Sequence, residues 1–197
     1  MSPRPDEGVL QALAALSEAL SAVKAPAMII GGIAVIARGV PRLTVDVDAT
    51  VWGADVSLDD LFATLKAYGI VPRIPDAEAF ARHRQVLLLE HRPSGTPLEV
   101  SLGWLPFERE ALHRASEVDF GGLSISVPQV DDLIVYKAVA WRGRDRDDIE
   151  RLLLLHGDRI DLDRIRDLVR QFSEALEEPE RVAELEALIG KTLGPPA

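Results

Sequence analysis

Polar and apolar residues alternate strictly over residues 43–52, and this segment limits the fold of the chain more than any other. Such alternation is typical of a β-strand with one buried face, because successive side chains of a strand point to opposite faces of its sheet. Val45 and Val47 fall on the apolar face, whereas Asp46 and Asp48 fall on the polar face. The sequence therefore predicts a strand that carries two carboxylates on one face.

Two like charges on one face of a strand repel each other, since side chains two residues apart lie ~7 Å apart. A bound divalent cation offsets this repulsion, because Mg²⁺ prefers carboxylate oxygens and keeps its other coordination positions for water and substrate phosphates. A solvated strand face tolerates the pair as well. Taken alone, Asp46 and Asp48 favour the solvated face, so the metal interpretation depends on the residues around them.

Residues suited to binding phosphate precede the acidic pair. The apolar residues 27–30 predict a buried strand, which Gly31 and Gly32 turn into a helix. Paired glycines at such a turn let backbone N–H groups approach an anion, although a tight strand–helix turn explains them as well. Arg42 and Thr44 offer a cation and a hydroxyl to phosphate oxygens. These neighbours favour a site for a metal-bound phosphate.

A third carboxylate comes from a second alternating segment. Residues 98–102 place Glu99 and Ser101 opposite three apolar residues. We expect this strand to lie beside the strand of Asp46 and Asp48, which would bring Glu99 into one site with them. The alternative is a polar residue on the edge of the sheet.

The chain changes character after Pro128. The part before it mixes two patterns, which predict helices over residues 8–24, 33–38, 57–68 and 76–83 and strands over residues 27–30, 43–52, 85–90, 98–102, 117–120 and 123–127. The part after it shows helical patterns alone, over residues 129–141, 145–156, 161–177 and 180–189. We therefore predict a mixed α/β part, residues 1–128, followed by a helical part, residues 129–197.

The composition excludes several classes of protein. The 197 residues include no cysteine, which excludes disulfide scaffolds, thiolate metal sites and cysteine nucleophiles. The net charge of −10 opposes a broad electrostatic surface for nucleic acid. The sequence shows neither a signal peptide nor an apolar run of the ~20 residues that a membrane span needs. We therefore predict a cytoplasmic protein with no membrane partner.

The spacing of the Gly-Gly pair and Asp46-Val-Asp48 resembles the signature of the DNA polymerase beta-like nucleotidyltransferase superfamily. The longer string Gly-Gly-Ile-Ala…Arg-Leu-Thr-Val-Asp-Val-Asp is most similar to the abortive-infection-type nucleotidyltransferase toxins of bacterial toxin–antitoxin systems. Those toxins also carry a lysine and an Arg-x-(Lys/Arg)-Asp-x-x-Asp run, matched here by Lys137 and residues 142–148. The resemblance implies an α/β (α+β) polymerase beta-like core with a mixed sheet, and a helical C-terminal region packed on it.

The resemblance also implies an activity: metal-dependent transfer of a nucleoside monophosphate from a nucleoside triphosphate to a hydroxyl acceptor. Asp46, Asp48 and Glu99 would be the catalytic carboxylates and would bind Mg²⁺ or Mn²⁺, with Glu99 standing where many relatives have Asp. The nucleotide-binding roles would fall on Gly31, Gly32, Arg42, Thr44, Lys137 and Arg142. For Arg142 and the acidic residues after it, pairing and capping within a helix is the alternative.

The acceptor and the partner follow from the resemblance less directly. A toxin of this kind would modify the 3′ end of a transfer RNA or a protein hydroxyl, and would have a cognate antitoxin as its partner. One alternative is a small-molecule acceptor, as in antibiotic-modifying nucleotidyltransferases. The other is a catalytically impaired relative that acts as a protein-binding module.

Overall fold

The computed structural model describes residues 5–194, which fall into two compact units. Within the described residues, the first unit comprises residues 5–37 together with Pro41–Pro128, and the second comprises Arg38–Val40 together with residues 129–194. Among the helices of the described range, none is both long and apolar enough to cross a bilayer.

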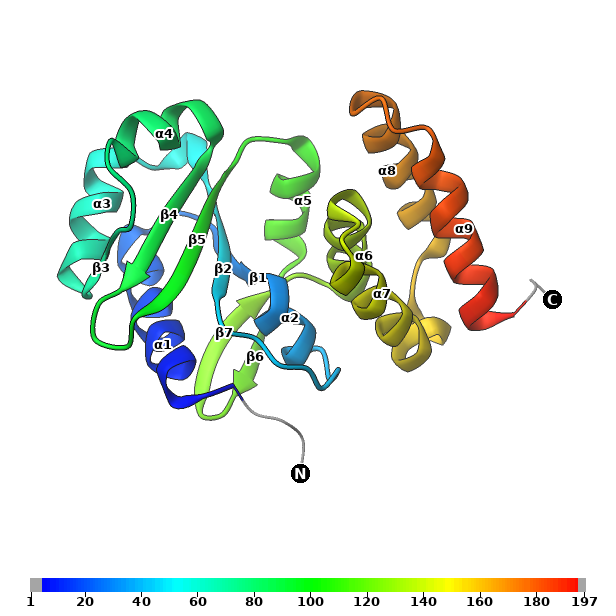
Figure 1. Cartoon of the computed structure of the whole chain (residues 1–197), viewed down its shortest axis with the longest axis horizontal. Coiled ribbons are helices and arrows are strands. Elements are labelled where there is room, and N and C mark those ends of the chain that lie inside the picture. Colours follow the sequence, from blue (N-terminus) through cyan, green and yellow to red (C-terminus); the bar gives the residue numbers. More distant parts are fainter. Residues whose placement is uncertain (1–4, 195–197) are drawn as a thin grey trace. The chain divides into compact units, whose positions relative to one another are not determined.

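A five-stranded mixed sheet forms the centre of the first unit, with the strand order β1-β2-β5-β4-β3 (Figure 1). Its strands are β1 (Ala27–Ile30), β2 (Val47–Trp52), β3 (Ile70–Pro72), β4 (Val86–His91) and β5 (Thr96–Gly103). β2 and β5 run parallel, whereas the other neighbours are antiparallel. The predicted α/β class with a mixed sheet is confirmed, as is the prediction that the strands carrying Asp48 and Glu99 are neighbours.

The strand of the acidic pair is shorter than predicted. β2 begins at Val47, and residues 43–46 lie outside it. The pairing of β5 with β2 begins at Val47 and Leu98, and that of β1 with β2 ends at Ile30 and Asp48, so residues 43–46 lie outside the paired part of the strand. Asp46 therefore precedes the strand. The alternation of side chains that was expected to place its carboxylate on the same face as Asp48 does not apply to it.

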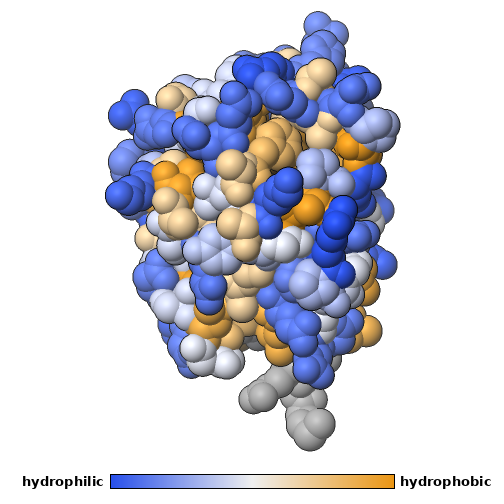
Figure 2. All heavy atoms as spheres, turned by 90° about the vertical axis from the view of Figure 1, so that its left-hand side faces the viewer, coloured by the Kyte–Doolittle hydropathy of each residue, from blue (hydrophilic) through white to orange (hydrophobic). Residues whose placement is uncertain are grey.

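Helices and a hairpin complete the first unit. The helices are α1 (Glu7–Val23), α2 (Gly31–Ala37), α3 (Leu58–Ala67), α4 (Ala77–Arg84) and α5 (Pro106–Arg114), with a short 3-10 helix, η1 (Gly53–Asp55). β6 (Ser116–Phe120) and β7 (Leu123–Val127) form a separate two-stranded hairpin. α1 and α3 lie side by side on one face of the sheet (Figure 1). Seen from the side of α3 and α4, hydrophilic side chains cover most of the surface (Figure 2).

Alternation in the sheet determines where the polar residues of the first unit lie. Val47, Ala49 and Val51 of β2 are fully buried, as are Leu98 and Val100 of β5. This apolar face supplies the core, because burial of such side chains stabilises the fold. The opposite face of the same two strands therefore carries their polar residues.

Up to residue 194, the helices of the second unit are α6 (Val130–Ala140), α7 (Gly143–His156), α8 (Leu162–Ala175) and α9 (Glu180–Leu193), with a 3-10 turn, η2 (Gly157–Arg159). Asp161 caps α8, since its carboxylate accepts a hydrogen bond from the backbone N–H of Arg164 at 2.9 Å. His156 hydrogen-bonds the carbonyl oxygen of Arg38 at 2.8 Å, which attaches Arg38–Val40 to this unit.

Candidate active site

Gly31 and Asp48 come into contact where β1 pairs with β2. Ile30, the last residue of β1, pairs with Asp48, and α2 begins at the next residue, Gly31. A Cβ atom on residue 31 would overlap Oδ2 of Asp48 and would lie 2.7 Å from its Cγ. Gly31 also has a φ of +63°, which L side chains disfavour. Glycine is therefore required here both by its backbone conformation and by the carboxylate beside it.

The second glycine accommodates residues that precede the strand. A Cβ atom on Gly32 would lie 2.5 Å from Oγ1 of Thr44 and 3.3 Å from Cζ of Arg42. Thr44 is buried, and its hydroxyl donates a hydrogen bond to Oδ1 of Asp46 at 2.8 Å. The glycine pair thus lies directly against the side chains that follow α2 in the sequence.

The structure brings six of the residues singled out in the sequence into one group, here called the Gly-Asp cluster: Gly31, Gly32, Arg42, Thr44, Asp46 and Asp48. Two carboxylates are a donor set that Mg²⁺ or Mn²⁺ accepts, with the remaining positions left for water and phosphate oxygens. Across residues 5–194, no three His, Cys, Asp or Glu side chains are grouped so as to hold a metal ion. Within this range, Asp46, Asp48 and Glu99 are therefore not brought together as the three-carboxylate group that the resemblance implies.

Glu99 lies beside the cluster, but its carboxylate has another partner. It pairs in register with Asp48 on the neighbouring parallel strand, so both residues lie on one face of the sheet. Its Oε1 accepts a hydrogen bond from Nη2 of Arg73 at 2.7 Å, and the two side chains are 47% and 35% exposed. Sequence reasoning missed Arg73 because it follows β3, a three-residue strand that no pattern in the sequence indicates.

Lys137 and Arg142 belong to the second unit, where both bind carboxylates. Nζ of Lys137 lies 3.0 Å from Oδ1 of Asp145 and 2.9 Å from Oδ2 of Asp148, and all three side chains are less than a tenth exposed. Arg142 donates to Oδ2 of Asp145 twice, from its backbone N–H at 3.0 Å and from its Nε at 2.8 Å. These contacts give the motif a role in joining α6 to α7.

The pKa of Asp145 reflects these partners. Burial acts to raise the pKa of this carboxyl, but the hydrogen bonds from Arg142 and Lys137, together with the charge of Lys137, outweigh burial and lower it below its ordinary value. The folded unit therefore holds Asp145 in its charged form.

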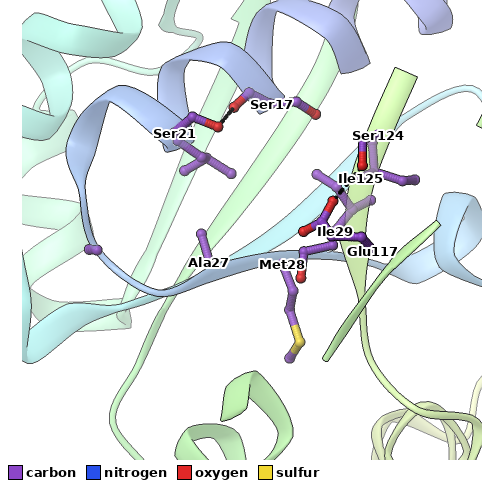
Figure 3. A pocket seen from close by; sticks show the side chains of 11 residues that line it. Ser17, Ser21, Ala27, Met28, Ile29, Glu117, Ser124 and Ile125 are labelled. Carbon is purple, nitrogen blue, oxygen red and sulfur yellow. Dashed lines mark hydrogen bonds between the residues drawn. The ribbon is translucent and has the colours of Figure 1, made fainter. Parts of the chain in front are cut away.

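Two hollows in the first unit lie away from the Gly-Asp cluster. A cavity of about 170 Å³ lies between α1, β1 and the hairpin (Figure 3). Two of its hydroxyls are already bound: Ser21 donates to the carbonyl oxygen of Ser17, and Ser124 donates to Glu117. A second hollow, of about 550 Å³, includes Trp52 and Trp104 among its lining residues. Neither lining includes a residue of the Gly-Asp cluster.

One family model matches most of the chain. A family model described as "Nucleotidyltransferase of unknown function (DUF6036)" matches residues 8–189. No curated protein matches the chain.

Several solved structures share the fold. ANT(2")-Ia in complex with adenylyl-2"-tobramycin is 18% identical, with a TM-score of 0.58 over 87% of this chain and 99% of that chain. The solution structure of the same antibiotic-resistance factor is 20% identical, with a TM-score of 0.55 over 91% and 95%. An antigenic nucleotidyltransferase-like protein from Paracoccidioides brasiliensis is 14% identical, with a TM-score of 0.54 over 96% and 95%. Identities this low show the fold alone.

Replacing Gly31 with alanine tests its contact with Asp48. Gly95→Ala is a matched control, because Gly95 has a φ of +68° and a Cβ there would meet nothing within 4 Å. We expect Gly95→Ala to lower the free energy of unfolding by about 1–2 kcal/mol, the cost of a left-handed alanine. Gly31→Ala should cost at least ~1 kcal/mol more, because the methyl group also displaces the carboxylate. Urea denaturation measures both.

The contact is isolated by repeating Gly31→Ala in an Asp48→Ala background. With the carboxylate removed, the cost of Gly31→Ala should fall toward that of Gly95→Ala but stay above it, because Cβ of residue 48 still lies 2.9 Å from the added methyl group. Equal costs for Gly31→Ala and Gly95→Ala in the wild-type background would contradict the contact.

Asp145→Asn tests the buried ion pairs of the second unit. Removing one charge of a buried pair leaves its partners uncompensated, so we expect a loss of about 3–5 kcal/mol in the free energy of unfolding at neutral pH. Because folding lowers the pKa of Asp145, its contribution is complete above the unfolded value of ~3.9 and is lost as the pH falls through the folded value. The variant should therefore lose less stability on acidification than the wild type, as measured by urea denaturation at several pH values.

Asp167→Asn is the control for Asp145→Asn, since Asp167 forms an exposed ion pair with Arg170. Its effect on stability should stay below about 1 kcal/mol. An Asp145→Asn protein as stable as this control would show that the Lys137 contacts do not hold the helices.

Proposed function

Because the chain belongs to the nucleotidyltransferase family DUF6036, we propose that it transfers a nucleoside monophosphate from a nucleoside triphosphate to a hydroxyl acceptor, with release of pyrophosphate, using a divalent cation bound by Asp46 and Asp48. One observation carries this proposal: the carboxylate of Asp48 lies directly against the backbone of Gly31. A carboxylate can bind a cation, and a glycine backbone beside it lets a phosphate approach the same cation.

Each residue of the Gly-Asp cluster has a part in this proposal. Asp46 and Asp48 would hold the cation, and the hydrogen bond from Thr44 orients the Asp46 carboxylate. When bound, Mg²⁺ or Mn²⁺ supplies positive charge that stabilises the phosphate oxygens during transfer. Gly31 and Gly32 would let the triphosphate approach the backbone, and Arg42 would add a guanidinium next to Gly32.

Glu99 is the residue we propose to turn toward the bound cation and to receive the proton of the acceptor hydroxyl. Its register with Asp48 places it on the same face of the sheet, one strand away. A general base must lie within hydrogen-bonding reach of the proton it takes, and neighbouring strands are ~4.8 Å apart. No covalent intermediate with the protein is needed, because positioning and charge stabilisation account for phosphoryl-type transfer.

We propose a small hydroxyl-bearing molecule as the acceptor. The net charge of −10 repels a polyanion such as transfer RNA and favours an acceptor that is neutral or cationic. The similar structure of ANT(2")-Ia holds adenylyl-2"-tobramycin, a small molecule that carries an adenylyl group. Transfer to a transfer RNA 3′ end or to a protein, and with it a role as a toxin with an antitoxin partner, is the alternative that the resemblance of the sequence supports.

Asp48→Asn tests the cation and nucleotide site. Mn²⁺ with ATP should raise the melting temperature of the wild type, since a ligand at a hundredfold excess over its Kd adds about 2.7 kcal/mol to stability. Asp48→Asn should lose this increase, because it removes a charge that we propose to hold the cation. Differential scanning fluorimetry measures both effects.

Asp147→Asn serves as the control, because Asp147 is an exposed residue of α7 in the second unit. It should keep the full increase. If Asp48→Asn also keeps it, the nucleotide binds elsewhere and the proposed site is wrong.

Labelled nucleoside triphosphates identify the acceptor. Incubated with a cell extract, the wild type should place label on a species that passes a small-pore filter and resists both ribonuclease and protease. Label removed by ribonuclease would instead support transfer RNA, and label removed by protease would support a protein. No labelling with any of the four triphosphates would favour the protein-binding module.

A further inference from the structure

A row of paired residues crosses the sheet beside the Gly-Asp cluster. Asp48 pairs with Glu99 between β2 and β5, and Glu99 pairs with Leu88 between β5 and β4. Beyond the last paired residue of β3, the backbone N–H of Arg73 donates to the carbonyl oxygen of Leu88 at 3.1 Å. Glu99 therefore has Asp48 on one side and, across Leu88, Arg73 on the other.

The carboxylate of Glu99 is turned toward Arg73. Its Oε1 accepts the hydrogen bond from Nη2 of Arg73 at 2.7 Å. The Arg73 side chain spans the width of one strand to make this contact, since Leu88 separates the two residues in the row. Glu99 thus makes its ion pair in the direction of β3, away from Asp48, although both carboxylates belong to the same face of the sheet.

The ion pair between Arg73 and Glu99 is weak enough for Glu99 to exchange Arg73 for another cation. The side chains of Arg73 and Glu99 are 35% and 47% exposed, and ion pairs between exposed side chains contribute little to stability. Glutamate has three side-chain torsions and Asp48 lies only one strand away, ~4.8 Å, so rotation is enough to turn the carboxylate toward Asp48. A divalent cation beside Asp48 would attract it more strongly than a single guanidinium does.

We infer that Arg73 is a positioning residue that holds Glu99 away from the cation site until a metal-bound nucleotide arrives. This inference rests on the proposed function, because it takes Asp48 as a ligand of the cation. In the empty protein the guanidinium neutralises Glu99 and keeps a third negative charge from Asp46 and Asp48. When a cation binds, Glu99 exchanges Arg73 for it.

A competition of this kind has a measurable consequence: Arg73 weakens the binding of the cation by itself. Arg73→Gln removes the charge while keeping a side chain of polar character. We expect it to bind Mn²⁺ about two- to fivefold more tightly than the wild type in the absence of nucleotide, the range that corresponds to an exposed ion pair. Electron paramagnetic resonance of free Mn²⁺ gives the Kd without any turnover.

Three further variants separate the explanations. Arg82→Gln breaks an exposed Arg–Glu pair on α4 and should leave the Kd for Mn²⁺ unchanged. Glu99→Gln combined with Arg73→Gln should lose the tighter binding, because Glu99 is the group that Arg73 competes for. Arg73→Lys, which keeps the charge, should bind Mn²⁺ as the wild type does.

The outcomes distinguish this inference from the proposed function. If Asp48→Asn weakens Mn²⁺ binding but Arg73→Gln binds no more tightly than the wild type, or its gain persists without Glu99, the role of Arg73 is wrong and the cation site stands. If Asp48→Asn binds Mn²⁺ as the wild type does, or if no variant binds it, the cation site itself fails and the role of Arg73 fails with it.

Discussion

The contact between the Asp48 carboxylate and the Gly31 backbone is the constraint on which the rest of the candidate site depends. β1 ends at Ile30, which pairs with Asp48, and the chain turns into α2 at the next residue. The turn and the carboxylate must therefore share one space, which only a residue without a side chain allows. Because strand pairing holds both groups, this contact is built into the sheet, whereas Arg42, Thr44 and Asp46 come from the segment before β2.

The protein contains both buried and exposed ion pairs. Lys137 lies between Asp145 and Asp148 inside the second unit, where low exposure makes each charge depend on its partners. Arg73 and Glu99 lie half-exposed at the sheet, where water screens their attraction. A buried pair suits a junction between helices, and an exposed pair suits a site whose charges change partners when a cation binds.

Local patterns were enough to predict most elements of the fold, and their failures have physical causes. The three residues of β3 are too few for a periodic pattern, and α5 buries only Phe107 and Ala111 along a largely polar sequence. The pattern of residues 43–52 predicts a longer strand than β2 because alternation records only which side chains are apolar. Where a strand begins depends on which of its residues pair with a neighbouring strand, and β2 pairs with β5 only from Val47 onward.

The sequence by itself determined the Gly-Gly turn, the Asp46–Asp48 pair and the strand that carries Glu99, because each depends on residues close together in the chain. Only the tertiary structure decided the partners of Glu99 and Lys137. Arg73 lies 26 residues before Glu99 and reaches it because the sheet places β3 and β5 on either side of β4. Lys137 meets Asp145 because α6 and α7 pack together, and the carboxylate compensates the charge of an ammonium group that this packing removes from water.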